Sequence, residues 1–232
     1  MTPAARCFAL VPCAGVGQRA GTGGPKQYSP LAGRSVVAHT LAALAAVPRI
    51  AGTLVVLAPD DTLFERHAPD FTGWVARVGG ATRAATVAHG LAVLRGKGAD
   101  DHDWVLVHDA ARCLLRPAWV ERLIDACWDD AVGGLLALPL ADTLKQEGTG
   151  AEAGRVDATL PRAGKWAAQT PQMFRLGLLQ RALLQAGAAV TDESGAIEAL
   201  GLAPRLVVGD LENLKVTWPG DFALAARLLE TR

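Results

Sequence analysis

Short apolar runs alternate with longer amphipathic or alanine-rich segments along most of this chain, and this alternation restricts the possible folds most strongly. The short runs are typical of buried strands, whereas the longer segments have the periodicity of helices. Strands that alternate with helices favour βαβ units and a mostly parallel sheet. We expect strands at residues 8–11, 53–58, 74–78, 103–108, 134–138, 205–209 and 213–216. We expect helices at residues 35–45, 82–94, 118–127, 176–186, 192–200 and 220–229, with Thr82 and Asp192 as N-caps.

Residues 139–162 interrupt this rhythm. The segment reads PLADTLKQEGTGAEAGRVDATLPR, which is polar, rich in turn residues and without helical periodicity. Two short extended pieces flank residues 148–154, as expected for a β-hairpin. A connection this long is uncommon in a compact domain unless it is functional or disordered. We interpret 139–162 as a β-arm that leaves a single α/β domain, residues 1–232, and returns to it; the alternative is a disordered loop.

The composition excludes several classes of partner. The chain has 232 residues, half of them hydrophobic, and its 23 basic residues balance 23 acidic ones. Because no excess of positive charge exists, we expect neither nucleic acid nor a membrane surface as a partner. The N-terminal apolar run is too short for a signal peptide, and the four cysteines show no zinc-type spacing. We therefore expect reduced thiols, a cytoplasmic protein and, at this length, no fused second enzyme.

A glycine-rich loop, residues 10–28, follows the first expected strand and reads LVPCAGVGQRAGTGGPKQY. It does not match the P-loop, because GPKQ lacks both the spacing and the hydroxyl residue of that motif. Gly15, Gly17 and Ala20 satisfy the letters of the dinucleotide-binding fingerprint. However, further glycines and Pro25 follow where that fingerprint should open a helix, so the context argues against a dinucleotide site.

The same loop fits a site for a nucleoside triphosphate better. Backbone amides from Ala14 to Gly17 can form a nest that binds an anion. Arg19 and Lys26 are spaced along the loop so that they could hold successive phosphates. The alternative is a mobile surface loop with solvated cations, although such loops rarely concentrate glycine, Arg and Pro-Lys directly after a buried strand.

Three further segments place polar groups near expected strand ends or helix starts. WVLVHDAAR puts Asp109 beyond a strand, where ligands bind in open α/β sheets, and Arg112 can bind a phosphate bidentately. GGATRAAT offers the Gly80 backbone and the Thr86 hydroxyl, and NLKVT offers Lys215. Read alone, Asp109 could instead cap a helix or a turn, and Lys215 could be solvated.

Together these segments resemble the 2-C-methyl-D-erythritol 4-phosphate cytidylyltransferase family of the non-mevalonate isoprenoid pathway. The loop VPCAGVGQRAGTGGPKQY is similar to the signature loop of nucleotidyltransferases that activate sugar or polyol phosphates, and PKQY narrows the likeness to this family. The likeness continues in order through nearly the whole chain, in VGGATRAATVAHGL, WVLVHDAAR, LADTLK, QTPQMF, TDESGAIE and NLKVTWPGD.

The resemblance implies a three-layer, Rossmann-like α/β fold with a protruding β-arm. It implies transfer of the cytidylyl group of CTP to 2-C-methyl-D-erythritol 4-phosphate, with Mg²⁺ as cofactor and a homodimer formed through the arm. The resemblance implies that Arg19, Lys26 and Lys215 are catalytic and that Asp109 lies next to the metal ion. The implied nucleotide-binding residues are Pro12, Cys13, Ala14, Gly15, Gly17, Gly80, Thr86, Asp109 and Ala110. The implied contacts to the polyol phosphate are Arg112, Thr143, Arg162 and Thr170, with Thr143 and Arg162 delivered by the arm into the partner's site.

Three positions depart from the family pattern. Relatives commonly carry an acid where Ala81 stands, Ser where Thr86 stands and Ala where Cys13 stands. Two other functions stay open on the residues alone: a ribitol 5-phosphate cytidylyltransferase, and a non-catalytic nucleotide-binding regulator on the same scaffold. Retention of the expected cations and of Asp109 argues against the regulator.

Two groups of polar residues receive a structural interpretation. Thr191, Asp192 and Glu193 look like a helix start, where acids in the first turn favour the helix dipole. The five histidines show no metal-ligand pairing, so we expect surface or capping roles for all of them.

Overall fold

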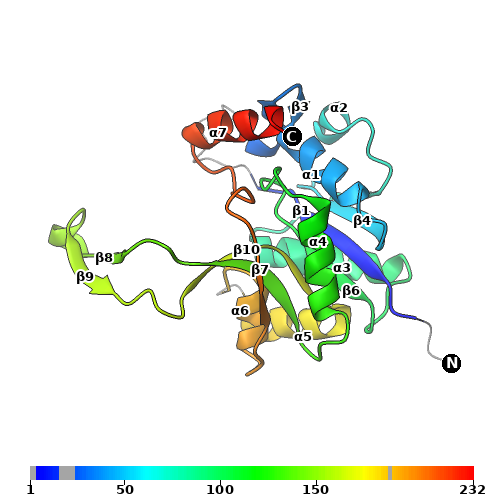
Figure 1. Cartoon of the computed structure of the whole chain (residues 1–232). Helices are drawn as coiled ribbons and strands as arrows, with labels where there is room; N and C mark the ends of the chain where they lie inside the picture. The colour runs from blue at the N-terminus through cyan, green and yellow to red at the C-terminus, as the bar shows by residue number, and fades with distance from the viewer. Residues whose placement is uncertain (1–3, 16–23, 188–189) are drawn as a thin grey trace.

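A mixed β-sheet of seven strands forms the centre of the molecule (Figure 1). The computed structural model describes residues 4–15, 24–187 and 190–232. From one edge to the other, the sheet contains β11 (Arg205–Val208), β7 (Gly133–Pro139), β10 (Trp166–Arg175), β6 (Trp104–Val107), β1 (Cys7–Pro12), β4 (Ile50–Val56) and β5 (Trp74–Ala76). Within this sheet β10 runs antiparallel to both of its neighbours, and the other neighbouring strands are parallel. The predicted α/β fold with a mostly parallel sheet is therefore confirmed.

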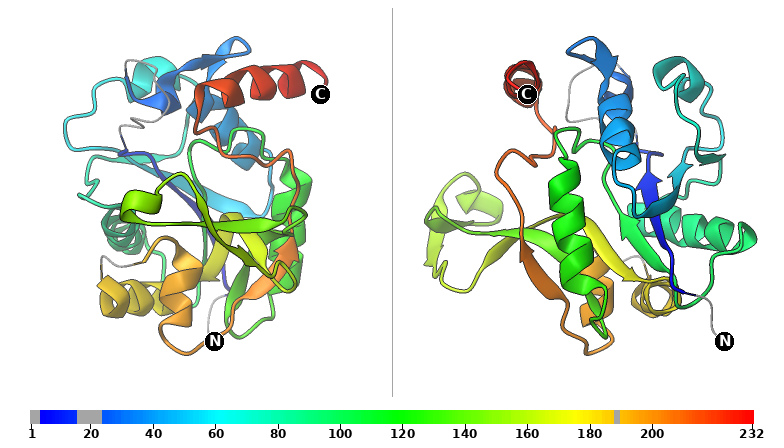
Figure 2. Two further views of the ribbon diagram at one scale, coloured as in Figure 1. Left: turned by 90° about the vertical axis from the view of Figure 1, so that its left-hand side faces the viewer. Right: turned by 45° about the vertical axis from the view of Figure 1, so that its right-hand side comes forward.

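Helices cover both faces of the sheet and complete the three layers (Figure 2). On one face lie α1 (Val36–Ala45) and α4 (Pro117–Cys127), and on the other lie α3 (Arg83–Gly96), α5 (Leu176–Ala186) and α6 (Glu193–Glu198). Side chains of β1 alternate between these layers, since Ala9 and Val11 join the first core whereas Phe8 and Leu10 join the second. Because alternate side chains point to opposite faces of the sheet, apolar residues at successive positions bury β1 on both faces.

Smaller elements surround the sheet. A single turn of 3₁₀ helix, η2 (Lys26–Tyr28), precedes the short hairpin of β2 (Pro30–Leu31) and β3 (Arg34–Ser35). The remaining helices are α2 (Phe64–His67) and α7 (Pro219–Glu230). Within the three described ranges, no helix is long and apolar enough to cross a membrane.

The segment interpreted as an arm contains a separate antiparallel pair, β8 (Leu144–Glu147) and β9 (Val156–Leu160), joined through η3 (Gly150–Glu152). The pair projects from the ends of β7 and β10, away from the central sheet (Figure 1). Most of its residues are exposed, so the body of the chain does not cover the arm.

Besides the short elements η2, β2, β3 and α2, which the sequence does not predict, the structure differs from the expected elements at residues 166–175 and 213–216. Residues 166–175 form a long strand that the sequence does not reveal, because Gln169, Pro171 and Gln172 interrupt its apolar pattern. A shift of register between Ala168 and Gln172 accommodates the proline, which cannot donate to the ladder. Residues 213–216 do not form the expected strand, and Val216 instead donates its N–H to the Ala111 carbonyl at 2.9 Å. The other predicted strands and helices are present with ends shifted by at most a few residues.

Both predicted N-caps are confirmed. The side chain of Thr82 accepts a hydrogen bond from the Ala85 N–H at 3.1 Å, and that of Asp192 accepts one from the Gly195 N–H at 3.0 Å. Each satisfies a backbone donor that would otherwise lack a partner in the first turn of its helix.

The central position of β6 predicts a large difference between two leucine substitutions. Leu106 is fully buried in β6, whereas Leu184 on α5 is 75% exposed. We expect Leu106→Ala to lower the free energy of unfolding by about 2–5 kcal/mol, because it leaves a cavity in the core. The control Leu184→Ala should change it by less than about 0.5 kcal/mol. Urea unfolding of both variants checks this, and equal losses would contradict the layer arrangement.

Candidate active site

Several predicted site residues lie in two loops at the carboxyl ends of β1 and β6, the edge where ligands bind in open α/β sheets. The first loop begins at Cys13, whose N–H donates to the Val56 carbonyl at 2.8 Å. The second begins at His108, whose N–H donates to the Leu10 carbonyl at 2.9 Å. Because β1 and β6 are neighbours, the two loops start side by side. The loop after β1 carries the predicted site residues Pro12, Cys13, Ala14 and Gly15. The loop after β6 carries Asp109, Ala110 and Arg112.

Asp109 is the anionic centre of this edge. Its Oδ1 accepts a hydrogen bond from Arg83 Nε at 2.9 Å, and its Oδ2 lies 2.8 Å from Lys215 Nζ. Its backbone N–H donates to the Thr170 hydroxyl at 3.0 Å. Burial alone would raise the pKa of Asp109, but the charges of Arg83 and Lys215 outweigh burial and hold that pKa below the usual range of an aspartate. Asp109 is therefore ionised at neutral pH.

Arg112 lies beside this centre, and one of its three nitrogens has no hydrogen-bond partner. Its Nη1 donates to the Asn213 carbonyl at 2.6 Å and its Nη2 to the Ala168 carbonyl at 3.3 Å. Its Nε is buried without a hydrogen-bond partner and lies 3.9 Å from Asp109 Oδ2. The guanidinium is thus fixed by backbone carbonyls, with its charge directed toward the site.

The PKQY turn brings a second lysine to the same edge. Lys26 Nζ donates to the Val216 carbonyl at 2.7 Å, so its ammonium group lies next to the segment that carries Lys215. Gln27 is buried, and its Nε2 donates to the carbonyls of Cys13 at 3.1 Å and Gly15 at 2.9 Å. This amide fastens the described start of the glycine loop to the turn. Gly17 and Arg19 lie outside the described residues.

The Gly79–Gly80 segment lies close against both the first loop and α3. A Cβ atom on Gly79 would lie 2.4 Å from the Cβ of Ala14, and one on Gly80 would lie 2.6 Å from the Cβ of Ala85. Neither position has room for a larger residue. The Gly80 N–H donates to the Thr86 hydroxyl at 3.1 Å, so Thr86 holds the segment in place.

The two arm residues are not part of this cluster within one protomer. Thr143 and Arg162 are exposed at the base of the arm, on either side of the β8–β9 pair. In the described part of the chain, no hydrogen bond or ion pair joins them to Asp109 or Lys215. Thr170, in contrast, is buried and contacts the Asp109 backbone directly.

One interpretation from the sequence is confirmed but incomplete, and a second needs correction. Glu193 does begin a helix, but it is also fully buried and binds Arg83 through both carboxylate oxygens, at 2.6 and 3.0 Å. The sequence pattern predicts neither Arg83 nor Glu193 as a site residue, although they lie in the GGATRAAT and TDESGAIE segments. His108 is also fully buried, not at the surface. Its position directly after the apolar run VLV is the signal that could have placed it inside.

His108 is neutral and has a defined tautomer. Its Nε2 lies 3.2 Å from the Arg112 carbonyl, which can only accept, so Nε2 carries the proton. Its Nδ1 then accepts from the Thr170 hydroxyl at 3.1 Å. Burial lowers the pKa of His108 to about 4. His108 therefore supports Thr170 and the Asp109 backbone as an uncharged group.

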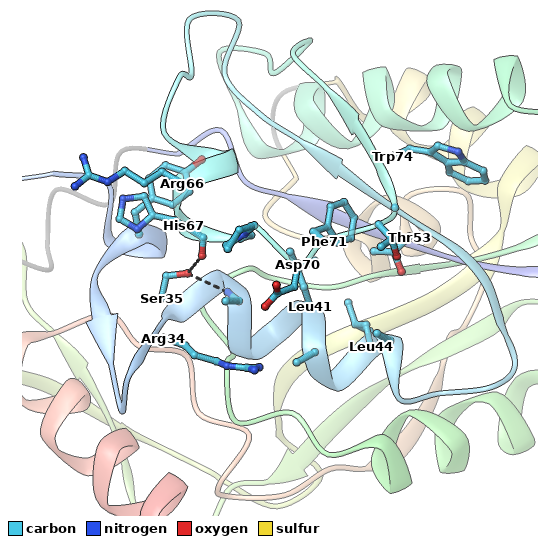
Figure 3. Close-up of a pocket in the computed structure, with 18 of the residues that line it drawn as sticks. Arg34, Ser35, Leu41, Leu44, Thr53, Arg66, His67, Asp70, Phe71 and Trp74 are labelled. Carbon is cyan, nitrogen blue, oxygen red and sulfur yellow. Dashed lines mark hydrogen bonds between the residues drawn. The ribbon is translucent and has the colours of Figure 1, made fainter.

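A separate cavity of about 1060 Å³ lies between α1, the start of β4 and residues 66–74 (Figure 3). Its walls are mainly apolar, with Leu41, Leu44 and Phe71, and it contains none of the predicted site residues. Tyr28 borders it and stacks on His67 with 4.9 Å between ring centroids. Because the convergent charges lie at Asp109 and not here, we place the active site at the strand ends despite the size of this cavity.

The comparisons with known proteins identify the family. Residues 7–231 match the family described as 2-C-methyl-D-erythritol 4-phosphate cytidylyltransferase. The chain belongs to this family. The cytidylyltransferase is 57% identical over 227 residues to the enzyme of that name from Laribacter hongkongensis, covering 97% of this chain and 96% of the relative. It superposes on the crystal structure of 4-diphosphocytidyl-2C-methyl-D-erythritol synthase with a TM-score of 0.86 and 41% identity, covering 98% of this chain and 100% of that one.

A further relative is longer than this chain. The bifunctional enzyme IspD/IspF of Albidiferax ferrireducens is 64% identical over 228 residues, covering 98% of this chain and 54% of the relative. The present cytidylyltransferase thus spans about half of that protein. The reaction of the present chain is the transfer of the cytidylyl group of CTP to 2-C-methyl-D-erythritol 4-phosphate in isoprenoid biosynthesis. The names of these three relatives give no support to a ribitol 5-phosphate cytidylyltransferase or to a non-catalytic regulator.

The low pKa of His108 predicts a specific loss of stability in acid. Between pH 6.5 and 4 the unfolded chain binds a proton at this histidine and the folded chain does not, so stability falls as the pH falls through this window. We expect the wild type to lose up to about 3 kcal/mol relative to His108→Gln over this range. Urea unfolding of both proteins at several pH values measures the difference. Parallel stability curves would contradict a buried neutral histidine.

Proposed function

We propose that an oxygen of the acceptor's phosphate attacks the α-phosphorus of CTP at the edge that carries Asp109, Lys215 and Lys26. A new P–O bond forms there, the bond between the α- and β-phosphates breaks, and pyrophosphate leaves. The observation that carries the proposal is the convergence of three cations on one buried carboxylate beside the PKQY turn. Transfers of this kind need positioned charge and little covalent chemistry from the protein.

Lys26 and Lys215 are proposed to stabilise the charge that develops on the α-phosphate, together with Arg19 of the glycine loop. The Lys215 side chain is 39% exposed, so a ligand can reach its ammonium group. Lys26 Nζ lies at the Val216 carbonyl, one residue along the chain from Lys215. Both ammonium groups are thus placed before the triphosphate binds, which is the arrangement that stabilises a transition state best.

The nucleotide is proposed to lie between the two loops and the Gly79–Gly80 segment. Close approach of Gly79 to Ala14 leaves backbone groups, and not side chains, to read the base. The implied wall consists of Pro12, Cys13, Ala14, Gly15, Gly17, Gly80, Thr86 and Ala110. Thr86 fits this role because its hydroxyl holds the Gly80 N–H in place.

Mg²⁺ is proposed to enter with the triphosphate. Within the described ranges no three His, Cys, Asp or Glu side chains form a group that could hold a metal ion. Asp109 offers a carboxylate at this edge, whereas both oxygens of Glu193 bind Arg83. One such carboxylate fits the usual binding of Mg²⁺ by one or two carboxylates together with substrate phosphates and water. When bound, the ion would neutralise phosphate charge. Asp109 would hold it, and the lysines and Arg112 would still orient the phosphates.

The acceptor phosphate is proposed to bind Arg112 and Thr170 of one protomer and Thr143 and Arg162 of its partner. Exposure of both arm residues, and the projection of the arm away from the body, support a site completed by a second copy (Figure 1). The cytidylyltransferase would then work as a homodimer. The four cysteines, all free and buried, suit the reducing conditions of the cytoplasm, where we propose that it acts.

Substitution of the two lysines tests the chemistry. With CTP, Mg²⁺ and 2-C-methyl-D-erythritol 4-phosphate, we expect Lys26→Ala and Lys215→Ala each to lower kcat by about 10²–10³, since each removes a preorganised donor. Pyrophosphate release measures the rate. The matched control Lys97→Ala removes an exposed lysine beyond α3 and should keep wild-type turnover. Wild-type rates in both active-site variants would refute the proposed clamp.

Mixing inactive variants tests the arm. If Arg162 acts in the partner's site, a mixture of Lys26→Ala and Arg162→Ala chains re-forms one intact site in each mixed dimer. Random pairing should then restore about a quarter of the wild-type activity. The control mixture, Lys26→Ala with Lys215→Ala, should recover none, because both lysines serve the site of their own chain. Equal recovery in both mixtures, or none in either, would count against the shared site.

A further inference from the structure

Glu193 is a fully buried carboxylate at the start of α6, and both of its oxygens bind one guanidinium group. Its Oε1 accepts from Arg83 Nη1 at 2.6 Å, and its Oε2 accepts from Arg83 Nη2 at 3.0 Å. The remaining nitrogen, Nε, donates to Asp109 Oδ1 at 2.9 Å. Because a guanidinium group is planar and rigid, fixing its outer edge on Glu193 also fixes the direction in which Nε points.

Asp109 is therefore held on two sides. Arg83 holds Oδ1, and Lys215 holds Oδ2 at 2.8 Å. The Arg83 side chain is 27% exposed and the Lys215 side chain 39%, so both cations lie between the buried interior and the site. Any rotation of the Asp109 carboxylate toward Arg83 would lengthen its contact with Lys215.

We propose that Glu193 is a positioning residue for cytidylyl transfer: by holding Arg83 in a bidentate pair, it keeps Asp109 oriented toward Lys215. This inference rests on the proposed role of Lys215 at the α-phosphate. Without the Glu193 charge, the two Nη groups of Arg83 lose their partner and turn toward Asp109, the nearest remaining carboxylate. Asp109 then pairs with Arg83 and releases Lys215 from the geometry that the reaction requires.

The start of α6 is also held by hydrogen bonds that do not involve Glu193. Asp192 caps the helix by accepting from the Gly195 N–H at 3.0 Å. Gln172 of β10 donates to Asp192 Oδ2 at 2.9 Å and accepts from the Ser194 N–H at 2.7 Å. These bonds anchor α6 to the sheet independently. Replacing Glu193 alone leaves the Arg83 charge without its buried partner, so Glu193→Gln is expected to lower the stability of the fold as well as kcat.

The decisive test is a double-substitution cycle between Glu193 and Lys215. In wild-type background, Glu193→Gln should lower kcat by about 10–100-fold, the usual cost of losing a group that orients a functional side chain. In the same assay, Lys215→Ala should cost much less in the Glu193→Gln background than in the wild type, because Lys215 is already displaced there. A purely structural role for Glu193 would make the two losses multiply.

Asp103 provides a matched control. It is a buried carboxylate at the opposite end of β6, where it pairs with Arg6 at 2.6 Å. Asp103→Asn removes a comparable charge, so it should lower the melting temperature while keeping kcat within about twofold, with an effect independent of Lys215. If Glu193→Gln does not fold, Arg83→Lys keeps the positive charge but loses the fork, and it should show the same coupling to Lys215.

The outcomes separate the inference from the proposed reaction. Coupling between Glu193 and Lys215, with none between Asp103 and Lys215, supports the positioning role. A folded Glu193→Gln enzyme with kcat within about twofold of the wild type, or with losses that multiply, would overturn it. Wild-type protein that releases no pyrophosphate would refute the proposed reaction itself.

Discussion

The ionised carboxylate of Asp109, held between Arg83 and Lys215, is the interaction on which the arrangement of the active site depends. A buried carboxylate is costly unless it is paired, and here the pairing also gathers cations at the carboxyl ends of the strands. With Lys26 and Arg112 included, these cations outnumber Asp109 and Glu193, so this edge carries a net positive charge. The chain as a whole is neutral, and the site therefore obtains its charge by local concentration.

The antiparallel strand β10 connects the layers to this charge cluster. It lies between β6 and β7, and residues 169–172 at its middle face three different partners. Gln169 donates to the Asp210 carbonyl at 2.8 Å, Thr170 accepts from the Asp109 N–H, and Gln172 bonds the start of α6. Gln169 and Gln172, which help to hide this strand from the sequence pattern, thus join it to the loop of Lys215 and to the helix of Glu193. Thr170 between them joins it to the loop of Asp109.

The sequence predicts those parts of the fold whose determinants are local. Aliphatic strands, amphipathic helices and the N-caps at Thr82 and Asp192 follow from neighbouring residues, and all are present except the expected strand at 213–216. The local pattern presents Glu193 only as a helix-start acid, because its partner, Arg83, is 110 residues away in the chain. The local pattern also predicts that Lys215 lies in a short strand. In the structure Lys215 lies in a loop, which brings its ammonium group to Asp109. Long-range ion pairs and backbone contacts of this kind leave no periodic signal, so only the folded chain reveals them.

The turn at residues 26–28, which follows the glycine loop, connects that loop to the segment of Lys215. Three consecutive residues of that turn act in three directions: Lys26 toward the Val216 carbonyl, Gln27 toward the carbonyls of the loop, and Tyr28 away from the site. Tyr28 is anchored by a 2.5 Å hydrogen bond from its hydroxyl to Asp61 and by its stack on His67. The turn therefore fixes Lys26 at the segment of Lys215 and, through Gln27, holds the described start of the glycine loop.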